Sequence, residues 1–413
     1  VLTMNSDFEG FEFGADVLSA LNSAEKGESL TKTIDYTRPL AEYASPQQIA
    51  DFILTNKKTK HVYTKDLRVN GAVVQDTFEK YLGAKHYGSS TIKEILKTPL
   101  HFSFAIDGDK KALEKLEDKK NHFEMGTFAH QAILEPTKFD RVIVEPKSSL
   151  SSTEGVNELI NFWTKVINDQ GYGIDHEGKQ ITPEEAFDMA SSDVVKLNLS
   201  MDKIDGKKVY FRSLAVLSGK EAIGETNFLK IQILRKHYER YGGGLLPRLL
   251  KHSKREISFY HTDPETGIDV KVRPDALQFE ENIGCNAIIS IKSSACEDLR
   301  AFMANSAKLH YDLSEGMYQE VCSEVTGRDF NCTITIFLQT VAPFAIAVLV
   351  WKPEDIEMGK YKYRTALRDI QKCAELGVYP GYDSLAEENT FGLVQMSLPN
   401  WNNVELAPKS IEN

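Results

Sequence analysis

The chain has 413 residues, of which 41% are hydrophobic and 26% charged, the composition of an ordinary globular protein. Its formal net charge of −11 excludes a surface that is basic all over, so any contact with nucleic acid has to come from a local basic patch. Five cysteines without CxxC spacing predict neither a disulfide framework nor a zinc or iron–sulfur site.

The longest strongly apolar run, residues 342–351, is about half the roughly 20 residues that a membrane-spanning helix needs. The first residues, VLTMNSDFEGFEFG, do not follow the pattern of a signal peptide. We therefore expect a cytoplasmic protein without membrane contact.

Residues 1–85 have mixed charge and no cluster of candidate catalytic groups, which indicates an accessory N-terminal region before a main domain at 86–413. From YGSSTIKEIL onward, apolar residues recur at helical spacing, and Ser89 or Ser90 is the expected N-cap. The segment FEMGTFAHQAILEP predicts a short buried helix that carries His130 and ends at Pro136.

Residues 150–225 are polar and rich in turn signals, which predicts an inserted helical or loop region. The helical stretch that follows, residues 226–256, is the strongest basic patch and therefore a candidate DNA-contacting surface, although a solvated helix face would look the same. Its basic residues are Lys230, Arg235, Lys236, Arg240, Arg248, Lys251, Lys254 and Arg255. GGG at 242–244 lacks the lysine of a phosphate loop and predicts a turn.

Strand patterns dominate the rest of the chain. The turn DPETG separates two alternating segments and predicts a hairpin, and NAIISIK predicts a further strand. A helix is expected over 307–327, with strands over 331–341 and 344–351. This order of elements predicts an α/β fold with a mixed β-sheet flanked by helices.

Asp275 and Lys292 are the candidates for chemistry within these strands. Cutting a phosphodiester with Mg²⁺ requires oxygen ligands beside the scissile phosphate, and Asp275 follows a strand end that could present such a ligand. Residues 290 and 292 project from the same face of their strand. Lys292 on an apolar strand needs a charged partner such as a carboxylate or phosphate, unless its ammonium group reaches water at the strand end.

These motifs also carry a family resemblance. The segments GTFAHQAILEP, TGIDVKVRPDAL and ISIKSS, followed by a helix with Tyr318, resemble in this order the exonuclease VIII branch of the PD-(D/E)xK nucleases of phages and prophages. YGSSTIKEILKTPLHF, YPGY at 379–382 and LPNW at 398–401 extend the resemblance over 86–402. It implies a restriction-endonuclease-like α/β core with an N-terminal extension and a helical insertion.

The resemblance also implies a function and roles for single residues. The expected protein is a Mg²⁺-dependent exodeoxyribonuclease, with Mn²⁺ as a substitute, that resects double-stranded DNA ends as a ring-like homo-oligomer and works with a single-strand annealing protein. Asp275 matches the first metal-binding carboxylate and Lys292 the lysine that positions the attacking water. His130 matches a histidine next to the metal and Tyr318 a tyrosine lining the site, although both could be core residues.

Two residues depart from the family pattern. Ser290 stands where the second acidic ligand would be, and Ser314 replaces a glutamine of the helix. A neutral hydroxyl is a poor Mg²⁺ ligand. Substitute carboxylates from other elements are Glu315, Glu320 and Glu256, each of which could equally be an ordinary surface glutamate. The sequence thus leaves two hypotheses open, an active nuclease and a catalytically degenerate nuclease fold that binds DNA or has a structural role.

Overall fold

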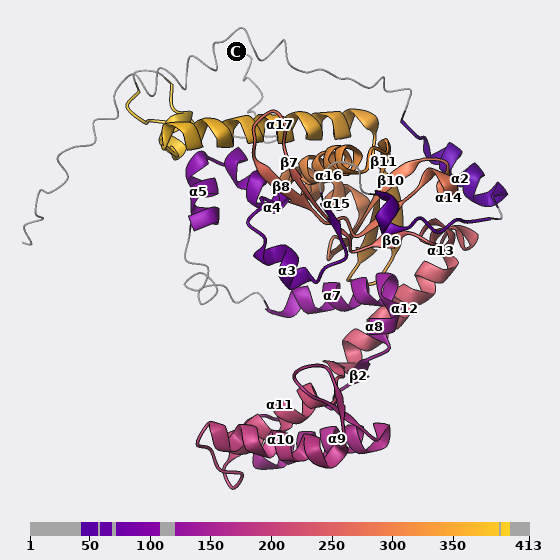
Figure 1. Ribbon diagram of the computed structural model, residues 1–413, viewed down its shortest axis with the longest axis vertical. Coiled ribbons are helices and arrows are strands. Elements are labelled where there is room, and N and C mark those ends of the chain that lie inside the picture. Colours follow the sequence, from indigo (N-terminus) through magenta and orange to yellow (C-terminus); the bar gives the residue numbers. More distant parts are fainter. Residues whose placement is uncertain (1–42, 57, 68–71, 108–119, 388–389, 397–413) are drawn as a thin grey trace, which may run out of the picture.

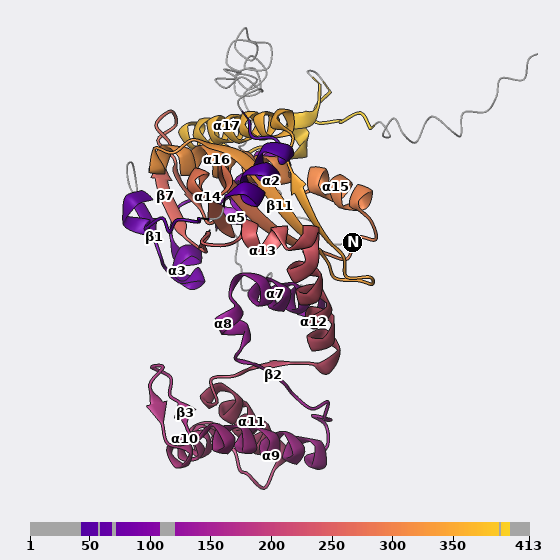
Figure 2. The same cartoon turned by 90° about the vertical axis from the view of Figure 1, so that its right-hand side faces the viewer.

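The structure, a computed structural model, describes residues 43–56, 58–67, 72–107, 120–387 and 390–396. Residues 1–42 and the LPNW motif at 398–401 lie outside the described residues. Figures 1 and 2 show a body of β-sheets covered by helices, from which a small helical bundle projects on the side opposite helix α17. Among the helices that the structure describes, none combines the length and the apolar character needed to cross a membrane.

The central sheet has five strands in the order β12-β11-β10-β9-β6. Strands β10 and β11 pair in parallel, while the other neighbours are antiparallel, so the expected mixed sheet is confirmed. A parallel pair needs a crossover connection, and helices α15 and α16 provide it. The strands are β6 Lys254–Arg255, β9 Ala276–Gln278, β10 Asn286–Ser294, β11 Phe330–Gln339 and β12 Ile346–Val350.

A second, three-stranded antiparallel sheet has the order β1-β7-β8, with β1 Ala72–Val74, β7 Ser258–Thr262 and β8 Asp269–Val272. The DPETG turn joins β7 to β8, which confirms the predicted hairpin. Strand β1 comes from the region expected to be accessory, and Ile49 and Ile53 of α2 (Pro46–Thr55) belong to the main hydrophobic core. Residue 85 is therefore no boundary between two units, because the described part of this region completes the body.

The described residues between β1 and the insertion are mostly helical. The helices are α3 Phe78–Gly83, α4 Ser89–Ile92, the 3₁₀ helix η3 Lys93–Leu96, α5 Pro99–Asp107, α7 Lys120–Leu134 and α8 Pro136–Phe139. The N-cap of α4 is Gly88, so the expectation of Ser89 or Ser90 was wrong. Helix α7 carries His130 and ends before Pro136, as predicted, because proline cannot continue the backbone hydrogen bonds.

The insertion forms a bundle with its own hydrophobic core around Trp163. Its helices are α9 Thr153–Gln170, α10 Pro183–Lys196 and α11 Ile204–Leu217, with a small hairpin of β3 Gly173–Ile174 and β4 Gln180–Ile181. The parallel strands β2 Val142–Val144 and β5 Glu221–Ile223 link the bundle to α8 and α12 (Figure 2). The polar composition of this region thus reflects a small exposed bundle.

The basic stretch is two helices rather than one, α12 Glu225–Arg240 and α13 Leu245–Leu249. Between them the short turn η4 Tyr241–Gly243 contains the predicted glycine turn, and Gly242, Gly243 and Gly244 all have positive φ. Only glycine adopts this backbone conformation without strain, which explains the run of three.

Helices α16 (Tyr311–Thr326) and α17 (Pro353–Leu376) cross in backbone contact. A Cβ atom at Gly359 would lie 2.0 Å from the carbonyl oxygen of Asp312, and one at Gly316 would lie 2.6 Å from the backbone nitrogen of Lys360. Glycine at both positions therefore fixes α16 between α17 and the sheet. The remaining elements are η2 Thr64–Leu67, α14 Glu280–Ile283, α15 Leu299–Lys308 and η5 Tyr382–Leu385.

Candidate metal centre

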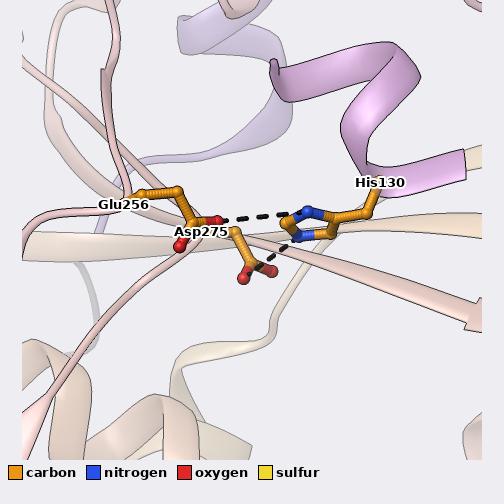
Figure 3. Close-up of side chains that lie close together, drawn as sticks. All are labelled: His130, Glu256 and Asp275. Atoms are coloured by element: carbon orange, nitrogen blue, oxygen red, sulfur yellow. Dashed lines mark ion pairs between the residues drawn. The ribbon is translucent and has the colours of Figure 1, made fainter. Parts of the chain in front are cut away.

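Three potential metal ligands converge at one edge of the central sheet. One ligand atom from each of His130, Glu256 and Asp275 lies within 4.8 Å of the others (Figure 3). Nε2 of His130 is 3.3 Å from Oδ1 of Asp275, and its Nδ1 is 4.0 Å from Oε1 of Glu256. All three side chains are partly buried. Two of the residues expected in the site, and one of the three substitute glutamates, are therefore brought together.

The backbone around each ligand holds it in place. Asp275 follows Pro274 between β8 and β9, and its Oδ2 accepts a hydrogen bond of 2.5 Å from the backbone N–H of Ile291 on β10. Glu256 lies in the turn between β6 and β7 with a left-handed φ of 52°, which is uncommon outside glycine. The two carboxylates thus come from strand ends, while His130 reaches them from α7.

An arginine and an aspartate support Glu256. Arg273 binds Glu256 at 2.9 Å through Nε and Asp76 at 2.8 Å through a terminal nitrogen. Asp76 also accepts hydrogen bonds from Ser258 and Tyr260. The side chain of Arg273 is 8% exposed, so this chain of contacts is a buried brace for the ligand.

Glu315 on α16 reaches the place beside Ser290. The Ser290 hydroxyl donates a hydrogen bond of 2.9 Å to Oε2 of Glu315, and both residues are fully buried. The other carboxylate oxygen, Oε1, has no hydrogen-bond partner among the described residues. A buried oxygen left unpaired in this way costs free energy unless a ligand occupies its free side.

Lys292 lies beside these carboxylates on the same strand as Ser290. Its Nζ is 5.2 Å from the centroid of the Tyr311 ring, and no carboxylate of the described residues pairs with it at ion-pair distance. Burial lowers the pKa of Lys292, but the charges of Glu315 and Asp275 outweigh it and raise the pKa above its ordinary value. The lysine is therefore cationic and close enough to both acids to interact with them electrostatically.

The same charges set the protonation of the ligands. Burial raises the pKa of Asp275, but the hydrogen bond with His130 and the charge of Lys292 bring it below its ordinary value. Burial lowers the pKa of His130, yet Asp275 raises it above the usual range. Burial raises the pKa of Glu315, and Lys292 and the Ser290 hydrogen bond only partly reverse this. The pKa values of Asp275, His130 and Glu315 are thus coupled to one another and to the charge of Lys292.

This donor set fits a hard divalent cation. Asp275 and Glu256 of the three-residue ligand group offer carboxylate oxygens, the ligands that Mg²⁺ and Mn²⁺ prefer. Glu315 lies outside this group, although its carboxylate interacts electrostatically with Asp275 and its Oε1 is unpaired among the described residues. His130 adds an imidazole nitrogen, which Mn²⁺ tolerates better than Mg²⁺.

Two other predicted site residues have different surroundings. Tyr318 hydrogen-bonds Ser89 and packs against the hydrophobic core, and burial followed by the charges of Glu315 and Asp275 raises its pKa. It is therefore packed against the core and close enough to both carboxylates to interact with them electrostatically. Glu320 pairs with Arg364 at 2.8 Å, so its selection as a substitute ligand was wrong.

The basic stretch is partly occupied by internal contacts. Arg255 donates to the carbonyl oxygen of Leu134 at the end of α7, Arg235 lies 5.9 Å from the ring centroid of Phe139, and Lys254 contacts His61. Arg255 and Arg235, both named as candidate DNA-contacting residues, thus make contacts within the fold. Lys230 is partly exposed, and the exposed members are Lys236, Arg240, Arg248 and Lys251.

Sequence reasoning missed the contacts of Arg273 with Glu256 and Asp76, and it missed Lys93, whose Nζ lies 5.3 Å from the centroid of the Tyr311 ring. Arg273 is the first residue of the motif RPD, two positions before Asp275. Asp76 and Lys93 come from segments distant in sequence, and only the fold brings them to the site.

The comparisons with known proteins add one weak similarity. No family model matches the chain, and no curated protein matches it. A crystal structure of a presumed exonuclease from Eubacterium rectale is similar with a TM-score of 0.42 at 12% sequence identity, covering 81% of this chain and 100% of that chain. The fold and the site define a mixed α/β protein with a carboxylate, histidine and lysine cluster, and a similarity of this strength carries no functional assignment.

Proposed function

We propose that this chain is a divalent-cation-dependent nuclease of the PD-(D/E)xK type, and more narrowly an exodeoxyribonuclease of the exonuclease VIII branch that acts on double-stranded DNA ends. The contact between Ser290 and Glu315 is the observation that carries the proposal. Strand β10 has Ser290 where the family pattern has an acidic ligand. The buried carboxylate of Glu315, from α16, accepts a hydrogen bond from this serine, and its other oxygen has no hydrogen-bond partner among the described residues.

In this proposal the residues of the site have separate catalytic roles. Asp275 and Glu315 would hold Mg²⁺, with Glu256 and His130 beside them, and the ion would polarise the phosphate and lower the pKa of a bound water. Lys292 keeps its ammonium group beside the carboxylates, where it orients the attacking water and stabilises negative charge that develops on the phosphate. The hydrogen bond from Ile291 keeps Asp275 at the sheet edge throughout.

The wider features of the resemblance belong to the same proposal. The exposed basic residues of α12 and α13 would contact the duplex backbone through charge, without reading sequence. Resection would leave a single strand for an annealing protein, in a phage or prophage setting, and a homo-oligomer would keep the enzyme on its substrate.

A cleavage assay tests the proposal. The full chain is incubated with linear duplex DNA in Mg²⁺, Mn²⁺ or EDTA, beside the variants Glu315→Gln and Lys292→Ala. We expect cation-dependent release of nucleotides by the unchanged protein and a loss of about hundredfold or more in each variant, because each removes a group that acts on the transition state. A closed circular duplex should resist, since it has no ends.

Glu320→Gln is the matched control, because Glu320 lies on the same helix and pairs with Arg364. It should cleave like the unchanged protein. Equal and negligible cleavage by all four proteins in both cations would overturn the proposal and favour a catalytically degenerate fold that binds DNA or has a structural role.

A further inference from the structure

A second lysine shares the Tyr311 ring with Lys292. Lys93 opens the 3₁₀ helix η3, and Tyr311 is the first residue of α16. The Nζ atom of Lys93 is 5.3 Å from the Tyr311 ring centroid, against 5.2 Å for Nζ of Lys292. Three separate segments of the chain thus bring two ammonium groups to one aromatic ring beside the candidate metal centre.

Neither ammonium group has a carboxylate at ion-pair distance among the residues described by the structure. Lys93 donates a hydrogen bond of 2.9 Å to the carbonyl oxygen of Leu309, at the end of α15. The partly buried lysines of the neighbouring helix differ, because Lys360 pairs with Glu357 at 2.9 Å and Lys362 with Asp312 at 2.5 Å. Buried Lys271 donates instead to three carbonyl oxygens, those of Tyr81, Leu82 and Ala84, whereas the structure gives Lys93 one such acceptor among the described residues.

The two lysines also act on each other. Burial, together with the charge of Lys292, lowers the pKa of Lys93 to about 8, although Glu315 and Asp312 oppose the shift. Two like charges that interact in this way cost free energy in the free protein. An anion within reach of either ammonium group would offset that cost and would gain a charge-assisted hydrogen bond.

We propose that Lys93, together with Tyr311 and Lys292, forms a binding subsite for a phosphate group of the DNA backbone, adjacent to the phosphate that Asp275 and Glu315 face. Lys93 is then a substrate-binding residue that keeps the strand in register with the metal centre. This inference rests on the proposed nuclease function, since it assigns the substrate contact of the same site.

The test measures binding and cleavage separately. A fluorescent linear duplex is titrated with the full chain in EDTA, so that neither a metal ion nor cleavage contributes, and the titration is repeated over a series of salt concentrations. We expect Lys93→Met to weaken binding about tenfold, because one charge-assisted contact is lost. The slope of log affinity against log salt should fall by about 0.9, the value for one phosphate contact with B-DNA.

Two further variants separate charge from structure. Lys97→Met is the control, because Lys97 lies one turn along the same segment and pairs with Glu94 at 2.8 Å. It should bind like the unchanged protein, whereas Lys93→Arg should restore most of the affinity and the salt slope. In Mg²⁺, Lys93→Met should raise KM for DNA more than it lowers kcat, with no change in the unfolding temperature.

Binding and salt slope unchanged in Lys93→Met, or changed equally in Lys97→Met, would overturn this inference even if the protein cleaves DNA. If no variant and no cation gives cleavage, but Lys93→Met still weakens binding with the altered salt slope, then the nuclease proposal fails while the phosphate subsite stands.

Discussion

Helix α16 carries buried charges toward two neighbours, and the two sets are paired differently. Toward α17, the guanidinium group of Arg364 meets the carboxylates of Asp263, Glu320 and Glu324. Toward β10, Glu315 accepts one hydrogen bond from Ser290 and keeps its other oxygen unpaired, and Lys292 has no carboxylate at ion-pair distance among the described residues.

This difference in pairing suggests that the residues around Arg364 form a structural cluster, whereas Glu315 and Lys292 form a binding cluster. When a buried charge is paired within the fold, removal of its partner leaves an uncompensated charge in a low-dielectric interior, which lowers the stability of the folded state. A buried charge without a partner costs free energy in the free protein, and a ligand of opposite charge recovers that cost on binding. We therefore expect changes around Arg364 to alter stability and changes around Glu315 to alter activity.

The largest effect on stability is expected for Arg364→Met. Removal of the guanidinium group leaves three carboxylates close together, and breaking a buried ion pair in this way costs about 3 kcal/mol or more. Urea unfolding measures the loss. The fraction that stays folded should cleave DNA at the normal rate, and a folded but inactive variant would contradict the division into two clusters.

Lys292→Met should have the opposite profile. We expect cleavage to fall about hundredfold or more, because the transition-state charge loses its cation. The free energy of unfolding should stay unchanged or rise, since the variant removes a half-buried charge that has no ion-pair partner among the described residues. Lys360→Met is the matched control, because Lys360 pairs with Glu357 and its loss should lower stability while cleavage persists.

The paired cluster should also give the protein a pH-dependent stability. Burial raises the pKa of Glu320 from about 4.5 to about 7, although Arg364 opposes the shift. Between these values the folded state holds a proton that the unfolded state has lost, so stability falls as pH rises through this window and levels off above it. Unfolding curves from pH 5 to 8 should show a loss of roughly 1 to 3 kcal/mol that is absent in Glu320→Gln. The same slope in both proteins would assign it to another group.

The smallest of these effects is expected for Ser290→Ala. The variant removes the one hydrogen bond that orients Glu315, and loss of such a supporting contact weakens metal binding by about tenfold. The cation concentration for half-maximal cleavage should rise accordingly, with little change at saturating Mn²⁺. An unchanged cation dependence would mean that the hydrogen bond from Ser290 is not needed to orient the Glu315 carboxylate.

Much of the fold could be predicted from the sequence, because strands β7, β8 and β10 alternate or run apolar and the DPETG turn is distinct. Asp275 and Lys292 were identifiable from their positions at a strand end and within a strand. These features depend on local periodicity, which a single sequence displays directly.

The rest of the site depends on contacts between distant segments. Glu315 and Glu320 lie on the same helix and were equivalent as candidates, and only the position of α16 between β10 and α17 separates them. Asp76 and Lys93 reach the site from segments that lie far from Asp275 and Lys292 in the sequence. The N-terminal boundary was misplaced for the same reason, since strand β1 shows no sequence signal for its pairing with β7.

Manganese binding measured by calorimetry tests the central claim most directly, because it needs neither DNA nor turnover. Unchanged protein, Glu315→Gln and Glu320→Gln are titrated with Mn²⁺ at one pH. We predict binding by the unchanged protein and by Glu320→Gln with the same affinity, and a loss of at least about tenfold in Glu315→Gln. Equal binding by all three proteins, or binding by none, would contradict the claim that Glu315 supplies the carboxylate that Ser290 lacks.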